Sequence, residues 1–206
     1  MAEYSIRYKA GSEYNTSNWS GGTTTELGIC PEGSHYADRD FVWRISSATV
    51  DLEESTFTAL PDYNRIIMTL EGEIDLCHNE GEWIHLKAFE THTFDGGDDT
   101  VSKGKVIDFN LMTRKGAADG AMIPFVFSEG TDGQTNYVLS DLNRYDEIMM
   151  YCHCGQIAIV TEDGNEQVLE KKESLWMKGD FSKASWEVRG QDGARAVMTA
   201  VTYKTY

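Results

Sequence analysis

Five polar residues in short apolar segments are the best candidates for chemistry in this chain. Arg44 and Ser46 alternate with apolar residues in one segment. Asp108 and Asn110 do so in another, and Arg65 directly precedes a third apolar run. A guanidinium group presents parallel N–H donors that match a carboxylate. The set therefore predicts a site for a small carboxylate-type ligand.

The same residues also fit a purely structural role. A charged residue among apolar strand residues is either exposed or buried with a partner. An ion pair between Asp108 and Arg44 or Arg65 would meet that need. The alternative to a structural ion pair is that these side chains line a ligand cavity. We assign no catalytic residue. The ligand-binding candidates are then Trp43, Arg44, Ser46, Arg65, Asp108 and Asn110.

The histidines and cysteines do not predict a metal site. The chain has five histidines but no His-x-His pair. His78, His85 and His92 are seven residues apart, and a turn at residues 79–81 separates the first two. On a strand, residues 152–154 (Cys-His-Cys) would point the two thiols to one face and the imidazole to the other. We therefore expect no metal and no other cofactor.

The elements that must position the candidate residues are short strands. Polar and apolar residues alternate with a period of two in residues 4–8, 41–46 and 107–112, and glycine-containing turns separate such runs. This pattern is typical of a sandwich or barrel. In residues 41–46 it predicts Trp43 on one face and Arg44 and Ser46 on the other. We expect an all-β chain with little helix.

An internal repeat is visible between residues 72–96 and residues 155–179, which match without a gap. Glycines coincide at turn positions, and Ile or Leu coincide on one strand face. Each window is typical of the middle of a cupin half, so the repeat predicts a bicupin, two tandem cupin-like jelly-roll β-barrels. We place the first barrel in residues 1–115 and the second in residues 116–206, packed as one compact unit.

The two copies differ in their polar residues. At the repeat offset, Arg65 of the first copy corresponds to Ile148 of the second. The second copy also has no counterpart of Trp43, Arg44 and Ser46. We therefore expect the ligand site in residues 1–115 and a supporting role for residues 116–206.

Composition limits the partners of the chain. Its 206 residues carry a formal charge of −16, which repels nucleic acid and anionic membrane surfaces. The first ten residues lack the apolar core of a signal peptide, and no apolar run reaches the length of a membrane helix. We expect a cytoplasmic protein without membrane or nucleic-acid partners, in which the four cysteines are thiols.

Several motifs resemble the HutD/Ves family when taken in order. They are Trp19-x-Gly21-Gly22-x-Thr24-x-Glu26-Leu27, Asp40-Phe41-Val42-Trp43-Arg44-Ile45-Ser46-x-Ala48, Pro61-x-x-x-Arg65, Leu70-Glu71-Gly72, Phe94-x-Gly96 and Asp108-Phe109-Asn110-x-Met112-x-Arg114. The resemblance covers most of residues 15–115 and implies a bicupin-type fold. It also implies a role in binding a small metabolite of histidine breakdown and tuning that pathway, or a link to stress. The chain departs from the family pattern at Asp62 and Asn64, and it lacks the glycine expected ahead of Phe57.

Three functions are consistent with these observations. The first is a metal-independent protein that binds a small anionic metabolite, with a regulatory role in histidine utilisation or a stress response. The second is a metal-free enzyme that acts on a small carboxylate, with Asp108 as base. The third is a structural or protein-interaction module, which predicts a closed first barrel without a cavity. A homodimer is possible, because edge strands of such sheets can pair.

Overall fold

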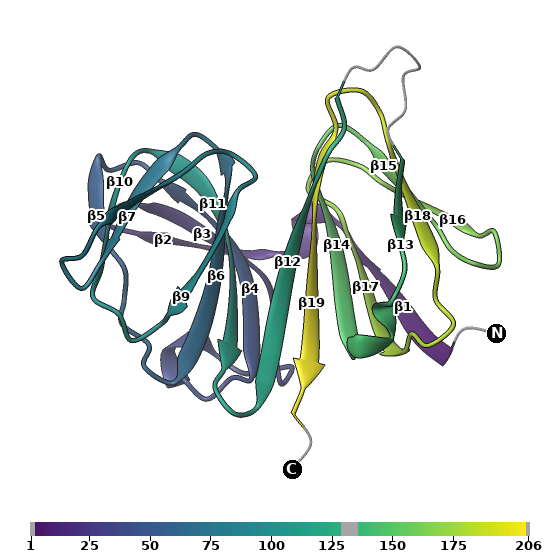
Figure 1. Cartoon of the computed structure of the whole chain (residues 1–206), viewed down its shortest axis with the longest axis horizontal. Helices are drawn as coiled ribbons and strands as arrows, with labels where there is room; N and C mark the ends of the chain where they lie inside the picture. The colour runs from purple at the N-terminus through teal and green to yellow at the C-terminus, as the bar shows by residue number, and fades with distance from the viewer. Residues whose placement is uncertain (1–2, 129–135, 205–206) are drawn as a thin grey trace. The chain divides into compact units, whose positions relative to one another are not determined.

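The computed structural model describes residues 3–128 and 136–204 and is almost entirely β-structure (Figure 1). The three helices in these residues are single 3-10 turns, η1 (Gly11–Glu13), η2 (Tyr36–Asp38) and η3 (Leu142–Arg144). No helix in the described ranges has the length and apolarity needed to cross a membrane. The prediction of an all-β chain with little helix is confirmed.

The chain divides into two compact units. The first unit contains residues 14–120, and the second contains residues 3–13 and 121–203. The N-terminal strand β1 (Glu3–Lys9) belongs to the second unit, where it pairs antiparallel with β17 (Ser174–Asp180). The candidate residues 44, 46, 65, 108 and 110 all belong to the first unit.

The first unit contains two antiparallel sheets. The larger has the order β2-β3-β4-β11-β6-β9 and the smaller the order β5-β10-β7-β8. Their strands are β2 (Asn15–Trp19), β3 (Gly22–Cys30), β4 (Trp43–Val50), β5 (Glu54–Thr56), β6 (Tyr63–Glu71), β7 (Ile74–His78), β8 (Trp83–Leu86), β9 (Thr91–Asp95), β10 (Thr100–Lys103) and β11 (Val106–Arg114). Ile67 and Val106 of the larger sheet share one apolar core with Ile74, Leu76 and Leu86 of the smaller. The two sheets therefore pack face to face as a sandwich.

The second unit is built in the same way. Its larger sheet has the order β1-β17-β14-β19-β12 and its smaller sheet the order β13-β18-β15-β16. The remaining strands are β12 (Ala118–Val126), β13 (Asn136–Leu139), β14 (Glu147–Cys154), β15 (Ile157–Val160), β16 (Glu166–Leu169), β18 (Trp186–Gly190) and β19 (Arg195–Tyr203). Buried residues of both sheets, among them Met150, Ile159, Val188 and Met198, form one core.

The internal repeat appears in the order of the strands. The order β9-β6-β11-β4 of the first unit corresponds to β17-β14-β19-β12 of the second, and β5-β10-β7-β8 corresponds to β13-β18-β15-β16. Gly72 and Gly155 occupy matching turns with φ of 81° and 72°. A Cβ on Gly72 would lie 2.6 Å from the Lys105 carbonyl oxygen, and one on Gly155 would lie 2.9 Å from Ala194 Cα. Both turns therefore require glycine. In the described residues none of the four sheets closes into a barrel.

Candidate functional site

A cavity of about 300 Å³ in the first unit brings most of the candidate residues together. Arg44, Ser46, Arg65, Asp108 and Asn110 all line it. They come from the three adjacent strands β4, β11 and β6 of the larger sheet. Alternation along each strand explains this gathering, because residues two apart point to the same face. The cavity also has three aromatic wall residues, Trp19, Tyr36 and Phe57.

The face of β4, β11 and β6 that lines the cavity forms its floor, and the strand register determines which side chains are neighbours there. Met112 of β11 lies opposite Arg44 of β4 and opposite Arg65 of β6. Two residues further along each strand, and therefore on the same face, Asn110 lies opposite Ser46. The two guanidinium groups therefore start from one row of the sheet, on either side of Met112, and the polar side chains form the next row.

Arg44 is held by partners of its own. Its Nε donates a hydrogen bond to Glu26 Oε2 at 2.7 Å, and its Nη1 donates to Ser46 Oγ at 3.0 Å. The guanidinium carbon lies 4.5 Å from the ring centroid of Tyr36, a cation–π contact. Glu26 lies on β3, opposite Ser46. The positive charge of Arg44 is therefore balanced before any ligand enters.

Arg65 is buried without such a balance. Its Nε donates to Asn110 Oδ1 at 3.4 Å, and its guanidinium carbon lies 4.8 Å from the ring centroid of Phe57 and 5.1 Å from that of Phe94. Within the described ranges no carboxylate oxygen lies within 4.0 Å of its nitrogens. Burial lowers the pKa of Arg65 to about 10, with Asp108 acting in the opposite direction, so the group stays charged at neutral pH.

Asp108 is the buried carboxyl of the cavity. Burial raises its pKa to about 7, against the attraction of Arg65, a backbone hydrogen bond from Ala48 and the attraction of Arg44. The group therefore exists in both protonation states near neutral pH, and its acid form can donate a hydrogen bond. Within the described ranges it forms no ion pair within 4.0 Å with either arginine. Glu26, and not Asp108, is the ionic partner of Arg44.

Trp43 is buried but is not among the residues that line the cavity. It precedes Arg44 on β4 and so points to the opposite face of the sheet. The sequence pattern had not singled out Glu26, Tyr36 or Phe57. Glu26 alternates with Thr24, which does line the cavity, and this period-two spacing was the available signal.

Two histidines that are far apart in the sequence meet in the first unit. His78 Nε2 and His92 Nε2 lie 3.0 Å apart, and His78 Nδ1 lies 2.8 Å from Thr100 Oγ1. Burial lowers the pKa of both histidines. His78 lies on β7 of the smaller sheet and His92 on β9 of the larger. The turn at residues 79–81 separates His78 from His85 in the chain, whereas the packing of β7 against β9 brings His78 next to His92.

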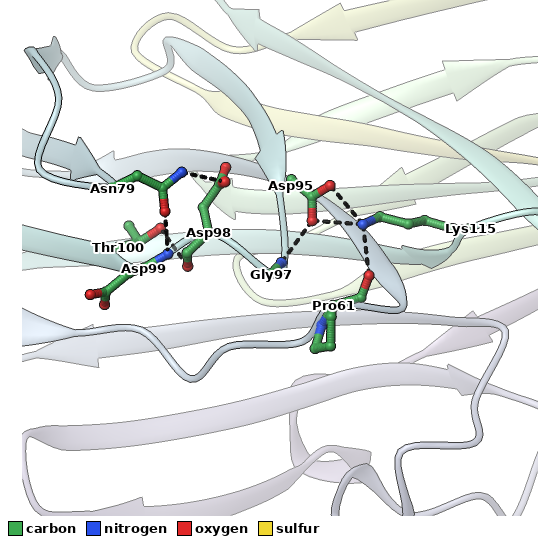
Figure 2. Close-up of polar contacts among 8 residues, drawn as sticks. All are labelled: Pro61, Asn79, Asp95, Gly97, Asp98, Asp99, Thr100 and Lys115. Carbon is green, nitrogen blue, oxygen red and sulfur yellow. Dashed lines mark hydrogen bonds and ion pairs between the residues drawn. The ribbon is translucent and has the colours of Figure 1, made fainter.

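The loop between β9 and β10 is fastened at two points (Figure 2). Lys115 Nζ donates to both carboxylate oxygens of Asp95 at 2.6 Å and to the Pro61 carbonyl oxygen at 2.7 Å. Asn79 Nδ2 donates to Asp98 Oδ1 at 2.7 Å, and the Asp99 N–H donates to Asn79 Oδ1 at 2.9 Å. Asn79 directly follows His78 in the chain. Its two hydrogen bonds to the loop therefore hold Thr100, which follows the loop, beside His78.

In the Cys-His-Cys segment of the second unit, Cys152 and His153 are buried and Cys154 is partly buried. Cys152 lies in the apolar core, and burial raises the pKa of its thiol to about 12. Such a thiol is a poor nucleophile and metal ligand at neutral pH. His153 is buried as well. No disulfide joins the four cysteines, all of which lie in the described residues.

The two-sheet units and the similar solved structures place the chain among cupin-like proteins. The HutD family model matches residues 11–196, and the chain belongs to the HutD family. A conserved protein of unknown function from Pseudomonas aeruginosa PAO1 is 21% identical with a TM-score of 0.78, covering 96% of this chain and 99% of that one. HutD from Pseudomonas fluorescens SBW25, in a formate condition, is 17% identical with a TM-score of 0.74, covering 98% and 100%.

A third similar structure is the formate complex of an oxalate decarboxylase from Lactobacillus farciminis. It is 6% identical with a TM-score of 0.60, covering 96% of this chain and 86% of that one. Identities this low show a shared fold. No curated protein sequence matches this chain significantly.

Proposed function

We propose that the first unit binds a small anionic metabolite in its cavity, with Arg65 as the anion-binding group. The observation that carries this proposal is the buried guanidinium of Arg65, which lines the cavity without an ionic partner among the described residues. A buried charge is costly unless it is paired. A ligand carboxylate would supply the missing charge and accept two parallel hydrogen bonds.

The neighbouring groups suit the rest of such a ligand. Asn110 and Ser46 are each held by an arginine and lie in adjacent positions of the floor. Asp108, in its acid form, can donate a hydrogen bond to a ligand oxygen. Tyr36 and Phe57 each lie against a guanidinium and limit its movement. Binding of the anion therefore needs only side chains of this chain.

Membership of the HutD family supports a regulatory version of this proposal, in which the bound metabolite tunes histidine utilisation. Two structures of similar fold are described with formate, the smallest carboxylate, which is consistent with a carboxylate ligand here. The bicupin arrangement of two tandem barrels is part of the same proposal, and the matching strand orders of the two units support it. The cavity argues against a pure interaction module, which predicted none.

Isothermal titration calorimetry with formate, glutamate, formylglutamate and urocanate tests the proposal. We expect at least one of them to bind to the wild-type chain and to lose its binding in Arg65→Gln. Arg189→Gln, at a partly exposed arginine of the second unit, is the matched control and should bind normally. Absence of binding by all four acids, or equal binding in Arg65→Gln, would contradict the proposal.

One observation favours an enzyme as the second candidate. The pKa of Asp108 is raised to about 7, which suits a general acid or base at neutral pH. Turnover of a small carboxylate that disappears in Asp108→Asn, with ligand binding retained, would support catalysis. If the chain binds one of these four acids but converts none of them, the result supports binding and contradicts catalysis.

A further inference from the structure

The histidine pair His78–His92 is a second set of chemical groups in the first unit, outside the lining of the cavity. We propose that it is a binding site for a divalent transition-metal ion of the nickel or copper type. The site lies where β7 of the smaller sheet approaches β9, the edge strand of the larger sheet.

The distance between the two ring nitrogens fits this use. A metal–imidazole bond is about 2.1 Å, so two nitrogens at right angles around one ion lie about 3.0 Å apart. His78 Nε2 and His92 Nε2 are 3.0 Å apart. Right-angled coordination by nitrogen and oxygen is typical of tetragonal Ni²⁺ and Cu²⁺ sites. The ion would lie to one side of the line between the nitrogens, about 2.1 Å from each, and its binding would release to solvent the proton that the two nitrogens share.

The surroundings of His78 orient it as a metal ligand. The Thr100 hydroxyl donates its proton to the Asp98 carbonyl oxygen at 3.3 Å, so its oxygen accepts from His78 Nδ1–H at 2.8 Å. This bond leaves a lone pair on His78 Nε2, which accepts the Nε2 proton of His92 and becomes available to an ion once that proton is released. A hydrogen bond at the second ring nitrogen is the usual support of a metal-bound histidine. Asn79 holds Asp98 and Asp99 in place beside Thr100 (Figure 2).

Both histidines are of intermediate burial, so the pair is partly accessible to solvent. The described residues contain no cluster of three or more metal-ligating side chains, so water would complete the coordination. The net charge of −16 favours a cation at the surface. His78 also feels an attraction to Asp98 and a repulsion between like charges from Arg65. Phe94 contacts both His78 and Arg65, so the pair lies close behind the cavity wall.

Calorimetric titration of the full chain with Ni²⁺ tests the proposal. We expect one ion per chain, with binding lost in His78→Gln and in His92→Gln and retained in His85→Gln. His85 is an exposed histidine that contacts Asp75 and is the matched control. We expect Thr100→Val, which keeps both ligands, to weaken binding roughly tenfold.

A second measurement separates a lost site from a misfolded variant. In the wild-type chain, addition of paramagnetic Ni²⁺ should shift and broaden the Nε2 NMR signals of His78 and His92 together and leave that of His85 unchanged. Absence of Ni²⁺ binding at millimolar concentration would overturn the proposal. Retention of binding in His92→Gln, its loss in His85→Gln, or unshifted His78 and His92 signals would do the same.

Discussion

Glu26 and Arg44 form a 2.7 Å ion pair across strands β3 and β4, at the edge of a cavity whose other arginine, Arg65, has no such partner in the described residues. The two guanidinium groups therefore differ in the role that we assign to them. Arg44 is a fixed part of the wall that also holds Ser46, whereas Arg65 is the group that we propose to bind the ligand anion.

Removal of the Glu26 charge should change both the stability of the chain and its affinity for anions. In Glu26→Gln the buried Arg44 loses its balancing charge, so we expect a loss of about 1–3 kcal/mol in the free energy of unfolding. The cavity then carries two uncompensated cations, so anions should bind several-fold more tightly. Urea denaturation and calorimetry measure the two effects. In the control pair the arginine, Arg189, has a side chain that is 41% exposed, against 8% for Arg44. Glu187→Gln should therefore cost less than about 1 kcal/mol, and equal losses in both variants would refute this role of Glu26.

The buried charge of Arg65 should lower the stability of the folded chain while it provides the anion-binding group. Arg65→Met removes an unpaired buried charge and keeps much of the side-chain volume, so we expect unfolding free energy to stay equal or rise by about 0–2 kcal/mol. Anion binding should be lost. Arg44→Met is the comparison, because it leaves Glu26 unpaired and should destabilise the chain. The idea fails if Arg65→Met unfolds more easily than Arg44→Met.

The raised pKa of Asp108 predicts a specific pH dependence of stability. Its pKa rises from 3.8 in the unfolded chain to about 7 in the folded one. The folded state therefore keeps a proton that the unfolded state has released, and this contribution to stability, complete below pH 4, is lost as the pH rises to 7. Relative to Asp108→Asn, the wild type should lose roughly 1.4 kcal/mol per pH unit in this window. A difference between the two proteins that does not vary with pH would contradict the assignment.

Anion binding should be coupled to protonation of Asp108. A carboxylate bound at Arg65 adds negative charge next to Asp108 and raises its pKa further, so binding takes up a proton. Affinity should be constant well below pH 7 and fall by up to about tenfold per pH unit above it. Calorimetry in buffers of different ionisation enthalpy measures the proton uptake directly. Asp108→Asn should show neither the uptake nor the decline, and a wild type that releases protons on binding would refute the coupling.

The strand faces of the cavity floor follow from alternation in the sequence. Because Arg44 and Ser46, and likewise Asp108 and Asn110, are two residues apart, each pair had to share a face. Trp43 is one residue from Arg44, so the same alternation places it on the opposite face of the sheet, away from the cavity floor. The all-β class follows from the same period-two pattern.

The register and the neighbours of the strands could not be predicted from the sequence. The register that brings Glu26 next to Arg44 includes an irregularity between Glu26 and Gly28, which no local pattern reveals. His78 and His92 meet because strands of two different sheets approach each other, and turn signals describe only consecutive strands. The partner of β1 could not be predicted either, because an alternating edge strand fits many sheets.

The pairing of β1 with β17 has a consequence for biosynthesis. Glu3 pairs with Asp180, so a growing polypeptide carries β1 unpaired until β17 has also left the ribosome. The first unit, with all its strands between residues 14 and 120, needs neither of these segments and can assemble its ligand cavity during translation. Completion of the second unit waits for a long-range closure, which is the slower kind of contact to form.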